Sequence, residues 1–291
     1  MITAGGTHLV SGDALVTGHP LAPRSGPQLL PPPFNHDERG CVRSLAALVV
    51  LQGAIGWWMV ASGLSERTDV SQIRLAIHLT LACAIFAATI WVICNLAIGS
   101  ERHGLGRASR LAAYALPALL LVQLFLGGLV AGLNAGFIYN SWPLIEGRFI
   151  PPLSELYPLT PAWLNHLETV KTVQFQHRML AYGLVLLALW HAFVLVRRRA
   201  AGPAGRAMAV QASIVAGLAR AQAAVGIMTL LLVVPVWSAL LHQALAVVLL
   251  GASIVHAHAM ARGAGRMRRS PRLLRIGQSP IRRPLTSETQ P

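Results

Sequence analysis

Six long apolar stretches constrain the fold of this chain more than any other feature of its sequence. Each is long enough for the roughly 20 residues that an α-helix needs to cross a hydrocarbon core of about 30 Å. Because a helix satisfies its backbone polar groups within one segment, the stretches predict an all-α polytopic membrane bundle of about six spans. They cover residues 43–64, 73–98, 110–132, 173–196, 208–234 and 237–261.

The basic residues are arranged on one side of these spans. The chain has 24 Lys and Arg against 10 Asp and Glu, a net charge of +14. The excess does not indicate a nucleic-acid partner, because the basic residues stand in short connections and a tail beside the apolar stretches, as in the positive-inside pattern. A six-span chain then has both termini in the cytoplasm. The basic residues on that side are Arg39, Arg43, Arg102, Arg107, Arg110, Arg197, Arg198, Arg199, Arg206 and those from Arg262 onward.

The pattern divides the chain into three parts. Residues 1–40 are rich in Gly, Pro, His and Ser and predict an irregular extension, residues 41–261 form the membrane domain in contact with lipid, and residues 262–291 form a basic cytoplasmic tail. The longest outer connection, residues 133–172, carries many aromatic residues and prolines. Such a segment serves either as an interfacial anchor or as a lid over a bound group.

A short pattern repeats in every second span. A glutamine is followed four residues later by a glycine, and the next span has a histidine just inside its outer end. This arrangement predicts three helical hairpins built on one plan, with small residues that allow close helix approach. The three sets are Gln52, Gly56 and His78; Gln123, Gly127 and His177; and Gln222, Gly226 and His242.

These three histidines are the candidate functional residues. A histidine within a span is costly and is a functional hypothesis by default, although hydrogen bonding inside the bundle is the alternative for any one of them. Three histidines at one depth favour ligation, and two on facing helices can bind haem iron from both sides. His191, His256 and His258 lie toward the inner ends of their spans, and we expect solvated or interfacial positions for them.

Two arginines on the outer side favour haem over other metal groups. Arg74 lies four residues before His78, on the same helical face, and Arg178 directly follows His177. Both stand against the positive-inside trend, so an anionic partner such as a haem propionate is expected, since arginine binds carboxylates well. The alternative is a snorkelling arginine at the interface.

The same segments resemble the haem A synthases of proteobacteria and mitochondria. The tryptophan-proline loop and the His-Arg and His-Gln pairs are the most specific parts of the likeness. The matching stretches are QGAIGWWMVASGL (52–64), RLAIHL (74–79), GGLVAGLNAGFIYNSWPLIEGRFIP (127–151), VQFQHRMLAY (173–182) and LHQA (241–244).

The resemblance implies eight spans in two four-helix halves. It implies that His177 and His242 hold the iron of a haem b in the C-terminal half (residues 108–261), and Arg178 is the contact that its charge and position predict for this cofactor. The N-terminal half would bind haem O, with His78 on the substrate iron, and Arg74 is the further contact that its charge and position predict. The activity it implies is oxidation of the C8 methyl group of haem O to a formyl group, in the bacterial inner membrane.

The chain departs from this pattern at its N-terminal side. The family carries two further spans before Gln52, the second with a Glu-x-x-His-Arg motif, and residues 1–40 contain neither, so residues 41–100 match only a remnant of the substrate half. The leading hypothesis is a haem A synthase, with haem O synthase and an electron donor as partners and with its catalytic residues unidentified. The alternatives are a non-catalytic bis-histidine haem b protein and an inactive truncated synthase. We expect little haem A from this chain alone.

Overall fold

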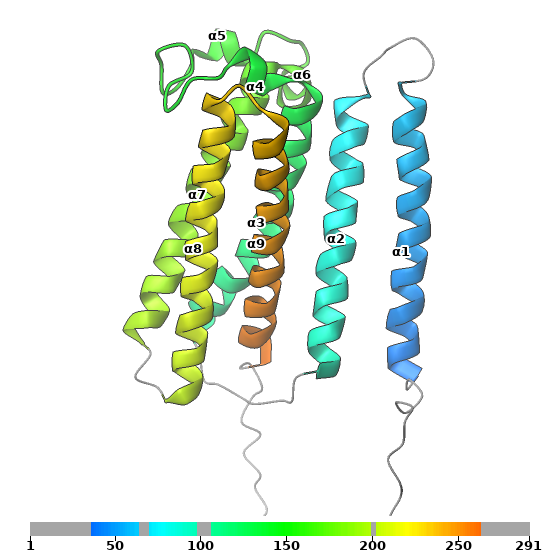
Figure 1. The fold of residues 1–291 in the computed structure, drawn as a ribbon, viewed down its shortest axis with the longest axis vertical. Coiled ribbons are helices and arrows are strands. Elements are labelled where there is room, and N and C mark those ends of the chain that lie inside the picture. Colours follow the sequence, from blue (N-terminus) through cyan, green and yellow to red (C-terminus); the bar gives the residue numbers. More distant parts are fainter. Residues whose placement is uncertain (1–35, 64–69, 98–105, 199–201, 263–291) are drawn as a thin grey trace, which may run out of the picture. The chain divides into compact units, whose positions relative to one another are not determined.

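Six long helices dominate the computed structural model, which describes residues 36–63, 70–97, 106–198 and 202–262. Each of the six is long and apolar enough to cross a membrane, which confirms the predicted all-α membrane bundle. Consecutive long helices run in opposite directions (Figure 1). Most of the predicted N-terminal extension and the basic tail lie outside the described residues. The helices are α1 (His36–Ala61), α2 (Gln72–Ala97), α3 (Arg107–Gly132), α7 (Val170–Arg197), α8 (Pro203–Leu231) and α9 (Val236–Arg262).

Most helix ends differ from the predicted spans by one to seven residues, and two of these differences have a clear cause. α1 begins at His36, inside the segment predicted to be irregular, because hydropathy does not detect a helical turn made of polar residues. α8 ends at Leu231, three residues before the predicted end. Val233 and Val234 have φ values of 60° and 54°, which end the helix, and Pro235 then opens the turn into α9. The apolar composition of this turn made the predicted span too long.

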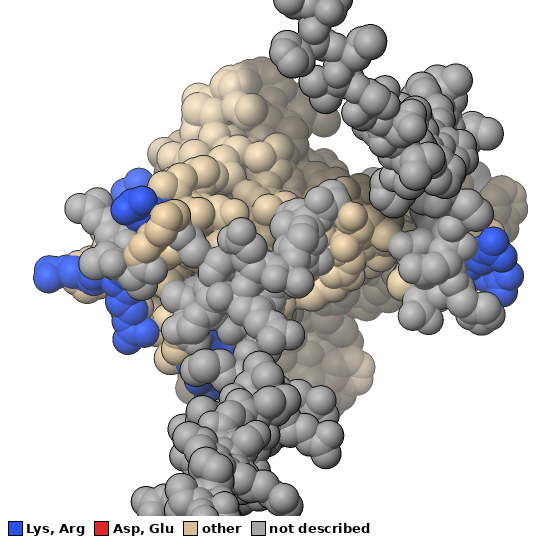
Figure 2. Space-filling model, turned by 90° about the horizontal axis from the view of Figure 1, so that it is seen from below, with Lys and Arg blue, Asp and Glu red and all other residues tan. Residues whose placement is uncertain are grey.

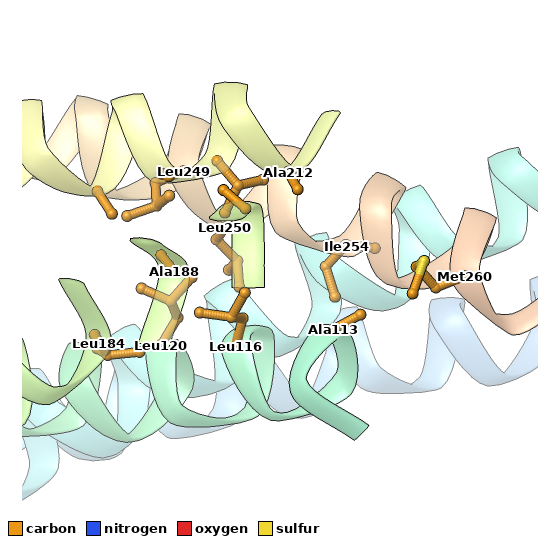
Figure 3. Packing of buried hydrophobic residues seen from close by; sticks show 14 of the residues in the cluster. Ala113, Leu116, Leu120, Leu184, Ala188, Ala212, Leu249, Leu250, Ile254 and Met260 are labelled. Carbon is orange, nitrogen blue, oxygen red and sulfur yellow. The ribbon is translucent and has the colours of Figure 1, made fainter. Parts of the chain in front are cut away.

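Helices α3, α7, α8 and α9 form a four-helix bundle. α7 and α9 each pack against both α3 and α8, so α7 and α9 occupy opposite corners. Apolar side chains from all four helices meet in the inner half of the bundle (Figure 3). In this arrangement the inward-facing sides of α7 and α9 lie opposite each other across the centre of the bundle. The core residues labelled in Figure 3 include Leu116, Leu120, Leu184, Ala188, Ala212, Leu249, Leu250 and Ile254.

Helix α2 packs against α3 and α9. A Cβ atom on Gly128 would lie 2.7 Å from the Cα of Ala76, and one on Gly132 would lie 2.6 Å from the Cα of Gln72. Two glycines four residues apart thus let the backbones of α3 and α2 come into direct contact, as in other membrane helix pairs. This contact sets the height of α2, and therefore of His78, against the bundle. In α1, by contrast, no described side chain is buried.

Basic side chains mark the opposite end of the molecule from the long connection. Figure 2 views the molecule from this end and shows Lys and Arg at the edges of the described surface, with acidic side chains hardly visible. Arg107, Arg110, Arg197, Arg198 and Arg206 lie at the ends of helices on this side. The hairpin arrangement thus gathers these five arginines at one end of the bundle, as the sequence pattern predicts.

Candidate functional site

Each of the three candidate histidines contacts the glutamine on the long helix before it in the chain. The glutamine Nε2 donates to the backbone carbonyl oxygen of the histidine at 3.0–3.1 Å and lies 3.0–3.2 Å from the ring Nδ1 and 3.2–3.4 Å from the ring Nε2. The repeat found in the sequence is therefore one structural unit used three times. The pairs are Gln52 with His78, Gln123 with His177, and Gln222 with His242.

The glycine of each repeat makes room for the histidine ring. A Cβ atom on Gly56 would lie 2.9 Å from Cε1 of His78, and one on Gly226 would lie 2.7 Å from Cε1 of His242. At Gly127 the corresponding distance, to Cε1 of His177, is 3.4 Å. Because glutamine and glycine are four residues apart, they stand on the same face of the helix, one turn apart. The two residues together form a seat for the ring.

His177 and His242 lie on α7 and α9, at opposite corners of the bundle. His191 and His256 lie 14 residues further along the same two helices, which is close to four turns, and their Nε2 atoms are 2.8 Å apart. The faces of α7 and α9 that carry these residues therefore meet across the bundle. His177 and His242 repeat this relation at the outer level and remain partly exposed. Two imidazoles in this relation can ligate one iron from both sides.

Two of the buried donors of Arg178 have no hydrogen-bond partner among the described residues. The side chain is 7% exposed. Its Nη2 donates to the carbonyl oxygen of Tyr139 at 3.1 Å and to Oε1 of Gln174 at 2.9 Å. In the described part of the chain, Nε and Nη1 are buried and have no hydrogen-bond partner. Unpaired buried donors are rare, and a guanidinium edge next to His177 fits a carboxylate such as a propionate.

Arg74 is placed differently. Its guanidinium lies over the ring of Trp58, 4.5 Å from the ring centroid, and Nη1 donates to the carbonyl oxygen of Trp58 at 2.8 Å. The residue therefore joins α2 to α1 at the outer end of this hairpin, by a cation–π contact and a hydrogen bond. It lies on the same helix as His78, one turn closer to the outer surface, as predicted.

The long outer connection folds into short helices at the end of the bundle nearest His177 and His242 (Figure 1). Lys171, at the start of α7, is 9% exposed and donates to Glu146 and Glu155, each at 2.6 Å. Arg148 pairs with Glu155 at 2.9 Å. The short elements are α4 (Ala135–Ile138), α5 (Leu153–Leu156), η1 (Ala162–Leu164) and α6 (Asn165–Glu168). The ion pairs of Lys171 thus hold the connection to α7.

The pKa of Glu155 is lowered from its ordinary value. The main cause is the hydrogen bond from Lys171, followed by the charges of Lys171 and Arg148. Aromatic contacts add to this attachment, since Trp142 Nε1 donates to the hydroxyl of Tyr182 at 2.9 Å and Phe149 stacks on the Tyr182 ring. These contacts attach the outer connection to α7.

Sequence analysis missed two residues of this outer region. Lys171 had a detectable signal, because it is a basic residue on the outer side, against the positive-inside trend. Tyr182 had a weaker one, since it lies one helical turn from Arg178 and faces the same way.

The inner histidines are not solvated, which corrects the expectation from the sequence. His191, His256 and His258 are each 1% exposed. His256 lies within hydrogen-bond distance of His191 at Nε2 and of Gln211 at Nδ1, and His258 Nε2 lies 2.8 Å from Oδ1 of Asn95 on α2. Their partners come from other helices, so the position of these histidines along their own spans did not reveal them.

These features define a multi-pass helical membrane protein in which hairpins present histidines at one level. A family model described as cytochrome oxidase assembly protein (COX15-CtaA) matches residues 35–254. The chain therefore belongs to this family, and the resemblance seen in the sequence is confirmed.

The curated relatives that match the chain include proteins named heme A synthase. The one from Rhodopseudomonas palustris (strain BisB5) is 49% identical over 79% of this chain and 62% of its own length. Those from Chelativorans sp. (strain BNC1) and Methylobacterium nodulans are 51% and 52% identical, over 57% and 58% of their own lengths. The chain thus spans about three fifths of these relatives. No solved structure matches it significantly.

Proposed function

We propose that this chain functions as a haem A synthase, oxidising the C8 methyl group of haem O to a formyl group. The observation that carries the proposal is the threefold unit of glutamine, glycine and histidine at one level of the membrane domain. Identities near 50% to proteins named heme A synthase give it independent support.

His177 and His242 are the proposed ligands of a resident haem b. They lie on helices at opposite corners of the bundle, and both are partly exposed, so a ligand can reach them. The inner pair, His191 and His256, is buried, and the two Nε2 atoms lie within hydrogen-bond distance of each other. The two unpaired donors of Arg178 fit a propionate of this group. Bis-histidine ligation of this kind suits electron exchange at the iron.

His78 is the proposed ligand of the substrate haem O. It has the same glutamine and glycine support, on a helix that contacts α3 and α9 of the proposed haem b half. Arg74 lies one turn outward and is the proposed contact for a propionate of the substrate. Replacing two hydrogens of a methyl group by one oxygen is a four-electron oxidation, so the reaction requires an oxidant that takes up four electrons and a source of the oxygen atom. A haem O synthase supplies the substrate.

The protein residues contribute position and shielding. The seats hold the rings at fixed depth, and the outer connection, fastened by Lys171 and Tyr182, limits access of water from the outer side. The basic inner ends of the helices support an orientation with both termini in the cytoplasm and the outer connection on the opposite side of the bacterial inner membrane.

Co-expression with a haem O synthase, in a host without haem A synthase, tests the activity. Extracted haems are separated by chromatography in two arms: the chain itself, and the chain fused behind the first two spans of one of its longer relatives. We expect haem A in the fusion arm, and the arm with the chain itself measures how much of the activity residues 1–291 provide. His78→Ala, His177→Ala and His242→Ala in the fusion should each abolish it.

Two results would count against the proposal. Absence of haem A from both arms, with the protein present in the membrane and loaded with haem b, would favour the non-catalytic haem b protein. Haem A production that survives both His177→Ala and His242→Ala would show that the proposed ligands are wrong.

A further inference from the structure

The three glutamines that support the candidate histidines share an unused acceptor. In each of them Oε1 is buried and has no hydrogen-bond partner within the described residues, while Nε2 donates to the histidine carbonyl. Buried polar atoms without a partner are uncommon in proteins, and here the same one occurs three times in the same setting. The three atoms are Oε1 of Gln52, Gln123 and Gln222.

Iron ligation would supply the missing donor. A neutral imidazole has one N–H, and a ring bound to a metal through Nε2 carries its proton on Nδ1. Metal-bound histidines nearly always donate that N–H in a hydrogen bond to an acceptor outside the ligand set, which orients the ring and raises its basicity. The amide nitrogen Nε2 of each glutamine already lies 3.0–3.2 Å from Nδ1 in all three pairs, so a rotation of the amide group brings Oε1 to that ring nitrogen.

The inner histidines provide a comparison with histidines that are not proposed to ligate iron. His256 has a partner at both ring nitrogens, Gln211 at Nδ1 and His191 at Nε2, so neither nitrogen is left for a ligand. His177 and His242, in contrast, make no side-chain hydrogen bond in the described structure except to their glutamines. Both kinds of histidine lie on the same two helices, so the difference comes from their partners.

We propose that Gln123 and Gln222 are positioning residues for the haem ligands His177 and His242. In the described structure each glutamine Nε2 donates to the backbone of the ligand helix; with haem bound, the amide turns so that Oε1 accepts a hydrogen bond from the Nδ1–H of the ligand ring. Gln52 does the same for His78 toward the substrate haem. The inference rests on the proposed function only in that the bound group is haem.

Paired substitutions in the purified full chain test this role by haem titration and by the properties of the bound haem. Gln222→Leu removes the acceptor and should weaken haem binding about 10–100-fold. It should also raise the midpoint potential of the haem, because a less basic imidazole stabilises the ferric iron less, and shift its low-spin EPR g values. Gln222→Glu keeps an acceptor oxygen and should retain haem with an affinity within a few-fold of the unsubstituted chain.

Gln211→Leu is the matched control, since it removes a glutamine–histidine contact from the same helix, eleven residues away. It should leave haem affinity, potential and EPR signal unchanged. The proposal is overturned if Gln222→Leu and Gln123→Leu both keep the haem properties of the unsubstituted chain, or if Gln211→Leu changes them equally. Normal haem properties in these variants together with haem A production by the fusion would overturn only the positioning role. An unsubstituted chain that binds no haem would overturn both proposals.

Discussion

Gly226 lies directly against the ring of His242, so adding one methyl group there moves a proposed iron ligand without changing its chemistry. In Gly226→Ala the new Cβ would lie 2.7 Å from Cε1 and 3.2 Å from Nδ1. Carbon atoms in ordinary contact are about 3.5–4.0 Å apart, so the ring has to retreat by about 1 Å. Ligands of a functional site have to be held within about 0.5 Å.

A displacement of this size should weaken haem binding by about 10–100-fold, as the loss of an outer contact of a metal ligand does. This range corresponds to about 1.4–2.7 kcal/mol. The measurement is a titration of the purified apoprotein with haem, followed by Soret absorbance and the low-spin EPR signal. The expected signal is weaker and broader in Gly226→Ala.

Two other glycines provide matched controls. Gly217 lies on the same helix, and a Cβ there meets nothing within 4 Å, so Gly217→Ala should leave haem binding unchanged. Gly217→Ala and Gly226→Ala gain the same helix propensity, up to about 1 kcal/mol. A difference in haem affinity between the two variants therefore comes from the contact with the His242 ring and not from helix stability. At Gly127 the new Cβ would lie at an ordinary 3.4 Å from His177, and we expect less than about a threefold loss. Equal haem affinity in Gly226→Ala and Gly217→Ala would refute the reasoning.

Three further predictions concern the outer half and the orientation. Arg178→Leu removes the buried donors beside His177 and should weaken haem binding by about tenfold or more in the same titration, since hydrogen bonds to charged groups contribute about 1.5–3 kcal/mol; unchanged affinity would rule out the propionate contact. Because the folded pKa of Glu155 is lowered, its contribution to the attachment of the outer connection is present above the ordinary value of 4.5 and is lost as pH falls through the folded pKa. The thermal midpoint followed by tryptophan fluorescence should therefore fall in acid, and Lys171→Met should remove most of this dependence; an equal dependence in both proteins would contradict it. Cysteines placed at Trp142 and Arg198 should be labelled from opposite sides of the membrane, and labelling of both from one side would exclude the six-span topology.

The number and identity of the spans followed from the sequence alone. Lipid requires each span to satisfy its own backbone groups, so apolar length is sufficient to place a helix, and the six predicted stretches match the six helices apart from their ends. The predicted start of the first span and the predicted end of the fifth were wrong, because the helices begin at His36 and end at Leu231, where the apolar composition does not change. The repeat of Gln222, Gly226 and their counterparts was also visible, because one helical turn separates the two residues and places them on one face.

The partner of each side chain was decided by the tertiary structure. Nothing in the local sequence indicates that the glutamine of one helix reaches the backbone carbonyl of the histidine on the next, or that Arg74 lies over Trp58. His177 and His191 stand in similar apolar surroundings, yet one contacts a glutamine with a spare acceptor and the other binds a second histidine. Periodicity determines which face of a helix a residue occupies, whereas the partner depends on which helices become neighbours. In this bundle that depends on packing between spans, through contacts such as those of Gly128 and Gly132 with α2.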